Sequence, residues 1–103
     1  MTALELSGAG AATVSHAPRS DAERSYFFLT SAADSSLLAR VLNIFIKIDL
    51  TPYRMHVSTE HGAGDEMAIE LRFAGMTPQI AEGLAARCRT IIGVRSVITA
   101  SDG

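Results

Sequence analysis

Cysteine is nearly absent from this chain: Cys88 is the single one among 103 residues. An intramolecular disulfide and any zinc or haem motif built on paired cysteines are therefore excluded. The longest apolar runs are only a few residues long, far below the ~18 residues that a membrane span requires. Nine basic and eleven acidic residues give a formal net charge of −2, without the basic excess of proteins that bind nucleic acid or anionic membranes. The N-terminus lacks the basic and apolar regions of a secretory signal, so we expect a cytoplasmic protein.

The apolar content, 48% of the residues, suffices for one modest core and hence for one domain. Residues 1–24 are rich in Ala, Gly, Ser and Thr and show no sustained hydrophobic period. This composition predicts a flexible N-terminal tail over residues 1–24. A folded domain is then expected over residues 25–100, with a short C-terminal end at residues 101–103.

Residues 35–49 have the pattern of a capped amphipathic helix. Its predicted buried stripe follows the i, i+3, i+4, i+7 spacing and consists of Leu38, Val41, Leu42, Phe45 and Ile48. Asp34, Ser35 or Ser36 can cap the first N–H groups. The Thr51-Pro52 pair ends the helix, because proline has no N–H and disfavours helical geometry in the residue before it.

Four segments have the pattern of strands. Residues 25–31 contain a short aromatic run, residues 53–60 and 66–73 alternate apolar with polar side chains, and residues 94–100 close the chain. The glycines in residues 61–65 predict a hairpin loop between the two alternating segments.

A second helix is predicted to begin at Pro78, with Thr77 as its cap, and to stop at Gly93. Its expected core face consists of Ile80, Leu84, Cys88 and Ile91. Together with the first helix, the residues that we expect to be largely buried include Leu38, Val41, Leu42, Phe45, Met67, Ile69, Leu71, Leu84 and Ile98.

The element order is therefore βαββαβ, which predicts an α+β protein of the ferredoxin-like class: a four-stranded antiparallel sheet with two helices on one face. Right-handed crossovers place the first and third strands in the centre and the second and fourth at the edges. The other face of the sheet is expected to be open. Its polar residues are Arg54, His56, Ser58, Glu70 and Arg72.

Three groups of residues invite a chemical interpretation, and each has a plainer one that we favour. Arg54, His56, Glu70 and Arg72 can bind an anion or move a proton, but charge pairing on a solvated face is the better explanation of them. His61, Asp65 and Glu66 can be taken for metal ligands, although a polar turn accounts for them. Cys88 is best interpreted as a small buried hydrophobe. Since no nucleophile stands beside a base, we expect no catalytic residues, no metal, no cofactor and no enzymatic activity.

The run from Leu38 to Phe45 resembles the first helix of ACT domains, and most of all that of the short regulatory (small) subunit of acetolactate synthase. The typical Leu-x-Arg-Val with an apolar pair one turn later is present as Leu38, Arg40, Val41, Ile44 and Phe45. The resemblance extends over about residues 26–99, including the third strand at residues 67–71 and the turn at residues 91–94. RNA-binding modules and metal chaperones share this topology but fit the sequence less well. Acidic residues on the third strand would repel the phosphates of RNA, and residues 31–36 lack the cysteine pair of metal chaperones.

The resemblance implies an effector site at the N-terminus of the first helix. There the N–H groups of Ser35, Ser36 and Leu37 would receive the carboxylate of an amino acid, and Thr51 would lie near its amino group across a dimer interface. Family members that bind an amino acid usually have glycine in place of Ser36 and Asp49, and asparagine in place of Thr51. We therefore expect effector binding to be weak or absent.

Two functions follow from the resemblance. In the first, the chain is a non-catalytic subunit that activates a larger catalytic subunit, of the acetolactate synthase type, in branched-chain amino-acid biosynthesis. In the second, it is a free-standing amino-acid sensor. Either way, the exposed edge at residues 53–60 and the helix at 35–49 predict a homodimer.

Overall fold

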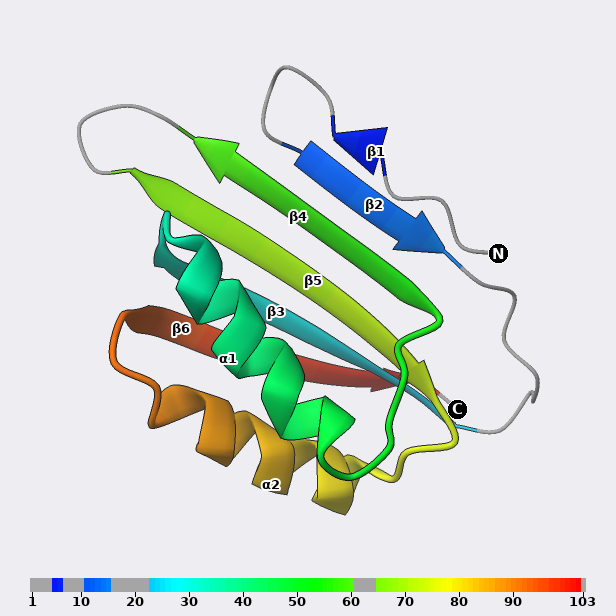
Figure 1. The fold of residues 1–103 in the computed structure, drawn as a ribbon. Coiled ribbons are helices and arrows are strands. Elements are labelled where there is room, and N and C mark those ends of the chain that lie inside the picture. Colours follow the sequence, from blue (N-terminus) through cyan, green and yellow to red (C-terminus); the bar gives the residue numbers. More distant parts are fainter. Residues whose placement is uncertain (1–4, 7–10, 16–22, 61–64, 103) are drawn as a thin grey trace.

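The computed structural model describes residues 5–6, 11–15, 23–60 and 65–102. Figure 1 shows the elements in chain order. They are β1 (Glu5–Leu6), β2 (Ala11–Ser15), β3 (Arg24–Ala32), α1 (Ser35–Ile46), β4 (Arg54–Glu60), β5 (Glu66–Ala74), α2 (Pro78–Arg89) and β6 (Val94–Asp102).

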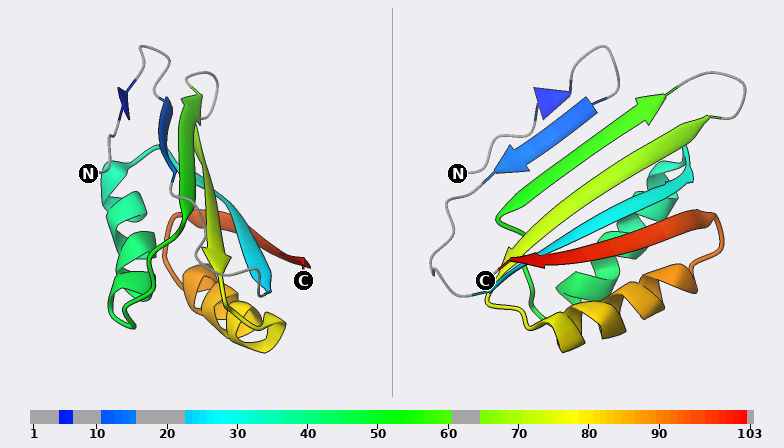
Figure 2. Two further views of the ribbon diagram at one scale, coloured as in Figure 1. Left: turned by 90° about the vertical axis from the view of Figure 1, so that its right-hand side faces the viewer. Right: turned by 180° about the vertical axis from the view of Figure 1, so that it is seen from behind.

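All strands belong to one antiparallel sheet with the order β1-β2-β4-β5-β3-β6. Both helices cover the same face, and the views from the side and from behind leave the other face uncovered (Figure 2). From β3 onward the order is βαββαβ, with β3 and β5 in the centre of that four-stranded unit. The predicted ferredoxin-like arrangement is confirmed.

Part of the N-terminal segment, which was predicted as a tail, lies in the sheet. Residues 11–15 form β2, which pairs with β4 from Ala11 opposite Ser58 to Ser15 opposite Arg54. The edge of β4 that was expected to be exposed therefore has a neighbour within the chain (Figure 1). On its other side β2 pairs with β1, so that β2 lies between β1 and β4.

Both helices begin where the capping residues predict. Asp34 is the cap of α1, and its carboxylate accepts a hydrogen bond from the Ser36 N–H at 2.9 Å. Thr77 caps α2 through a 3.3 Å bond from the Ile80 N–H to its hydroxyl, with Pro78 in the first turn. The end of α1 comes earlier than predicted. The helix stops at Ile46 because Asp49 has a φ of +59°, in the left-handed region that no helix residue occupies.

The core lies between the sheet and the two helices, and at its centre three phenylalanine rings meet. Phe45 of α1 stacks on Phe73 with ring centroids 4.7 Å apart and meets Phe27 edge-on at 5.2 Å. Six of the residues expected in the core are buried, namely Val41, Phe45, Met67, Ile69, Leu71 and Leu84. Leu38 and Leu42 are partly buried against it.

The prediction of a core position is wrong for three apolar residues, because Ile48, Ile80 and Ile98 are exposed. Ile48 follows the end of α1. On β6 it is Val97 that points inward, so Ile98 points to the open face, since neighbouring strand residues alternate. On α2 the buried stripe is Ala81, Leu84, Ala85 and Cys88.

Candidate functional site

The open face of the sheet carries the polar residues that the sequence placed there. Arg54, His56 and Ser58 of β4 alternate with the inward-facing Met55 and Val57. On β5, Glu70 and Arg72 alternate in the same way with buried neighbours. The register sets His56 opposite Glu70 and Arg54 opposite Arg72. The predicted cluster is therefore confirmed as a group on adjacent strands.

Within this cluster an ion pair joins two residues of β5. The Arg72 Nε lies 2.5 Å from the Glu70 Oε2, and its guanidinium carbon lies 5.1 Å from the centre of the Tyr26 ring. The hydrogen bond to Glu70 raises the pKa of Arg72 above its ordinary value. Arg72 is thus a permanent cation held by Glu70 and the Tyr26 ring. Such a group is suited to recognition of a ligand or partner and unsuited to proton transfer.

Beside this pair the open face has a hollow of about 210 Å³. Phe28 of β3 and Ile98 of β6 lie opposite each other in the register and form its apolar part. Their side chains are 39% and 61% exposed. Small residues form the neighbouring row, where Thr30 lies between Ala68 and Ser96. The hollow is lined by Phe28, Leu29, Thr30, His56, Ala68, Ile69, Glu70, Ser96 and Ile98.

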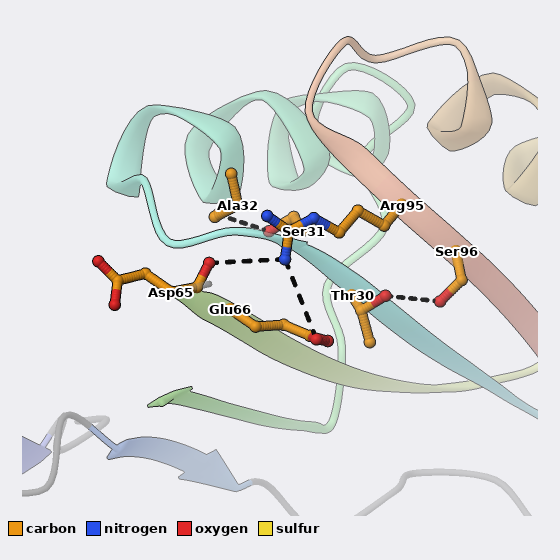
Figure 3. Close-up of polar contacts among 7 residues, drawn as sticks. All are labelled: Thr30, Ser31, Ala32, Asp65, Glu66, Arg95 and Ser96. Atoms are coloured by element: carbon orange, nitrogen blue, oxygen red, sulfur yellow. Dashed lines mark hydrogen bonds and ion pairs between the residues drawn. The ribbon is translucent and has the colours of Figure 1, made fainter. Parts of the chain in front are cut away.

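At one end of this face, Arg95 of β6 contacts Asp65 and Glu66 at the start of β5 (Figure 3). The register of β3 and β6 shifts between Thr30 and Ser31, which leaves Arg95 as an extra residue on β6. The Arg95 Nη1 lies 4.0 Å from the Glu66 Oε2 and 3.5 Å from the Asp65 carbonyl. Nearby, the Thr30 and Ser96 hydroxyls share a 2.6 Å hydrogen bond.

These contacts bear on the alternative of a metal site at His61, Asp65 and Glu66. His61 lies outside the described residues, and Glu66 has the Arg95 cation beside it. In the parts of the chain that the structure describes, no three histidine, cysteine or acidic residues are grouped so as to hold a metal.

The proposed effector site at the start of α1 already contains a carboxylate. The Ser36 N–H donates to the Asp34 side chain, and the Leu37 N–H donates to the Asp34 carbonyl at 3.0 Å. The bonds from Ser36 hold the pKa of Asp34 below its usual value, so this carboxylate is ionised at neutral pH. Leu37 is buried. An amino-acid carboxylate would have to compete with Asp34 for these donors.

Thr51 does not join Ser35, Ser36 and Leu37 within one chain. It follows the C-terminal end of α1, a helix of 12 residues, which corresponds to about 18 Å of length. Only a second copy of the chain can bring Thr51 to the other end of the helix, as the resemblance implies.

Cys88 is fully buried in the stripe of α2, as expected for a small hydrophobe. Burial raises the pKa of its thiol to about 11, so the thiol is protonated and unreactive at neutral pH.

Comparison with known proteins agrees with the fold. The family described as "ACT-like domain" matches residues 19–101. No curated protein matches the chain. Among solved structures, the C-terminal domain of the MgtC protein from Mycobacterium tuberculosis is similar, with a TM-score of 0.60 and 15% identity over 84% of this chain and 94% of that one. At that identity the likeness concerns the fold alone. Within the described residues, no helix is long and apolar enough to cross a membrane.

Proposed function

Because the chain belongs to the ACT-like domain family, we propose that it is a non-catalytic regulatory subunit that acts by binding another protein. The partner that we propose is the catalytic subunit of an acetolactate synthase-type enzyme of branched-chain amino-acid biosynthesis, in the cytoplasm. The support for this partner is the run Leu38, Arg40, Val41, Ile44 and Phe45, which resembles the small subunits of that enzyme.

One observation carries the preference for protein binding over effector sensing: the Asp34 carboxylate is bonded to the Ser36 N–H. In ACT domains that sense an amino acid, the helix N-terminus is the place for the ligand carboxylate. A ligand carboxylate near Asp34 would meet a like charge and a donor already in use. This arrangement favours a role in which the chain acts by contact with another polypeptide.

The alternative is a free-standing amino-acid sensor, and the conformation of Asp49 favours it. Family members tend to carry glycine there, and Asp49 keeps a positive φ of 59°, as that glycine would. Aspartate is one of the few residues that adopt this geometry at modest cost. The turn that leads to Thr51 is thus retained even though the glycine is replaced.

A homodimer through residues 53–60 and the helix at 35–49 is part of both proposals. In the structure, β2 pairs with the outer edge of β4, so side-by-side association through β4 would require β2 to leave that edge. The exposed side of α1 needs no such change and is lined by Ala39, Arg40, Leu42, Asn43 and Ile46.

Calorimetric titration with valine, leucine and isoleucine separates the two functions. We expect no affinity tighter than ~1 mM, which corresponds to a binding free energy of only about −4 kcal/mol. The Asp34→Ala variant supplies the sharper comparison, because it frees the Ser36 N–H and removes the like charge. If the helix N-terminus is the residual site, this variant should bind more tightly than the unmodified chain. Saturation of the unmodified chain at micromolar ligand would make the sensor the better function.

A further inference from the structure

The open face of the sheet carries basic side chains toward one end of its strands and acidic side chains toward the other. Toward one end lie Arg54 and Arg72, which are opposite each other on β4 and β5. Toward the other end lie Glu60 and Glu66, also opposite each other. The other described charges near the strand ends are Glu23, Arg24 and Asp102 at the first end, and Asp65 and Arg95 at the second. Each end therefore keeps an excess of one sign.

Between the two ends the face carries two exposed apolar side chains and is uneven in height. Phe28 and Ile98 stand in the middle row of the register, together with His56 and Glu70. One row toward the acidic end the side chains are small, namely Ser58, Ala68, Thr30 and Ser96. One row toward the basic end they are large, including Arg54, Arg72 and Tyr26. The row of Phe28 and Ile98 therefore lies between a row that contains large side chains and a row of small ones.

We propose that this face binds the same face of a second copy of the chain. A two-fold axis parallel to the strands would set basic end against basic end. A two-fold axis across the strands, passing between the row of Phe28 and the row of Thr30, reverses the ends and sets Arg54 and Arg72 of each copy over Glu60 and Glu66 of the other. The same rotation lays Phe28 and Ile98 of each copy over the small side chains of Thr30 and Ser96 of the other.

The size of the face agrees with such a contact. Strands β3, β5 and β6 have nine residues each and β4 has seven, so the face measures about 30 Å by about 19 Å, or roughly 550 Å² in projection. Stable interfaces bury about 800 Å² of accessible surface per partner. We therefore expect a dimer with a dissociation constant in the micromolar range, formed without displacing β2 from β4.

Sedimentation velocity over micromolar to near-millimolar concentrations tests this interface. The chain should pass from 10.9 kDa to twice that mass. Ile98→Asp should weaken the dimer by roughly 100-fold or more, because it places a charge at an apolar centre twice per dimer. Ile80→Asp on α2 is the matched control, since Ile80 is similarly exposed, at 52%, on an element of the covered face. This control should leave the dimer unchanged.

Charge reversal tests the orientation. Arg54→Glu and Glu60→Arg should each weaken the dimer about 5-fold to 10-fold, and the double variant should return to within about 3-fold of the unmodified chain. A chain that stays monomeric at the highest concentration overturns the proposal. A dimer that survives Ile98→Asp overturns it as well and points to association through β4 and α1. Failure of the double variant to recover contradicts the axis across the strands.

Discussion

Replacing Phe45 with alanine is expected to lower the free energy of unfolding by about 3–5 kcal/mol. Phe45 is 1% exposed and is the side chain of α1 that meets two sheet residues, Phe27 and Phe73. The substitution leaves a cavity between helix and sheet that neighbouring rings cannot close. Because small domains have a total stability of only about 5–15 kcal/mol, the variant should be close to unfolding.

Urea denaturation followed by circular dichroism measures this loss. Ile46→Ala is the matched control, since Ile46 is the next residue of α1 and is 65% exposed. Its effect should stay within about 0.5 kcal/mol. A loss below ~1 kcal/mol for Phe45→Ala would show that the centre of the core lies elsewhere.

The second large effect is expected at the turn before β6. Gly93 has a φ of +104°, and a Cβ added there would lie 2.7 Å from Cδ1 and 3.0 Å from Cδ2 of Leu37. Leu37 is 5% exposed and belongs to the hydrophobic core. Gly93→Ala combines backbone strain with overpacking and should therefore cost about 2–4 kcal/mol.

Gly83→Ala is the control for this substitution and should act in the opposite direction. Gly83 lies within α2, and a Cβ there meets nothing within 4 Å. Alanine in a helix is favoured over glycine by about 0.5–1 kcal/mol. Thermal unfolding of the two variants should give melting temperatures on opposite sides of the unmodified chain. Equal stability of Gly93→Ala and the unmodified chain would contradict the contact between this turn and α1.

The fold was predictable because independent local signals agree. Asp34 and Thr77 mark the helix starts, and the alternation from Glu66 to Phe73 fixes which face of β5 is buried. The errors have local causes as well. The end of α1 depends on the positive φ of Asp49, which no hydrophobic pattern reports. Ile98 was misplaced because its strand carries apolar residues at both Val97 and Ile98, so that alternation alone does not choose between them.

The functional surface was only partly predictable. Alternation was sufficient to place Arg54, His56, Glu70 and Arg72 on the open face. The separation of basic and acidic ends required the register between β4 and β5, which sequence alone does not give. The hydrogen bond from the Ser36 N–H to Asp34 could not be predicted either. By residue type, Asp34, Ser35 and Ser36 are equally good helix caps, and only the structure shows which one is used. The pairing of β2 with β4 depends on backbone hydrogen bonds and left no sequence signal that could have revealed it.

The regulatory role is tested most directly by titrating a purified acetolactate synthase-type catalytic subunit from the same organism with this chain, while the rate of acetolactate formation is measured. The account predicts a rate that rises with added chain and saturates as a complex forms, together with co-elution of the two proteins on size exclusion. The Phe45→Ala variant serves as the destabilised control and should give weaker activation. An unchanged rate without co-elution, at concentrations where the chain is folded, would contradict the account.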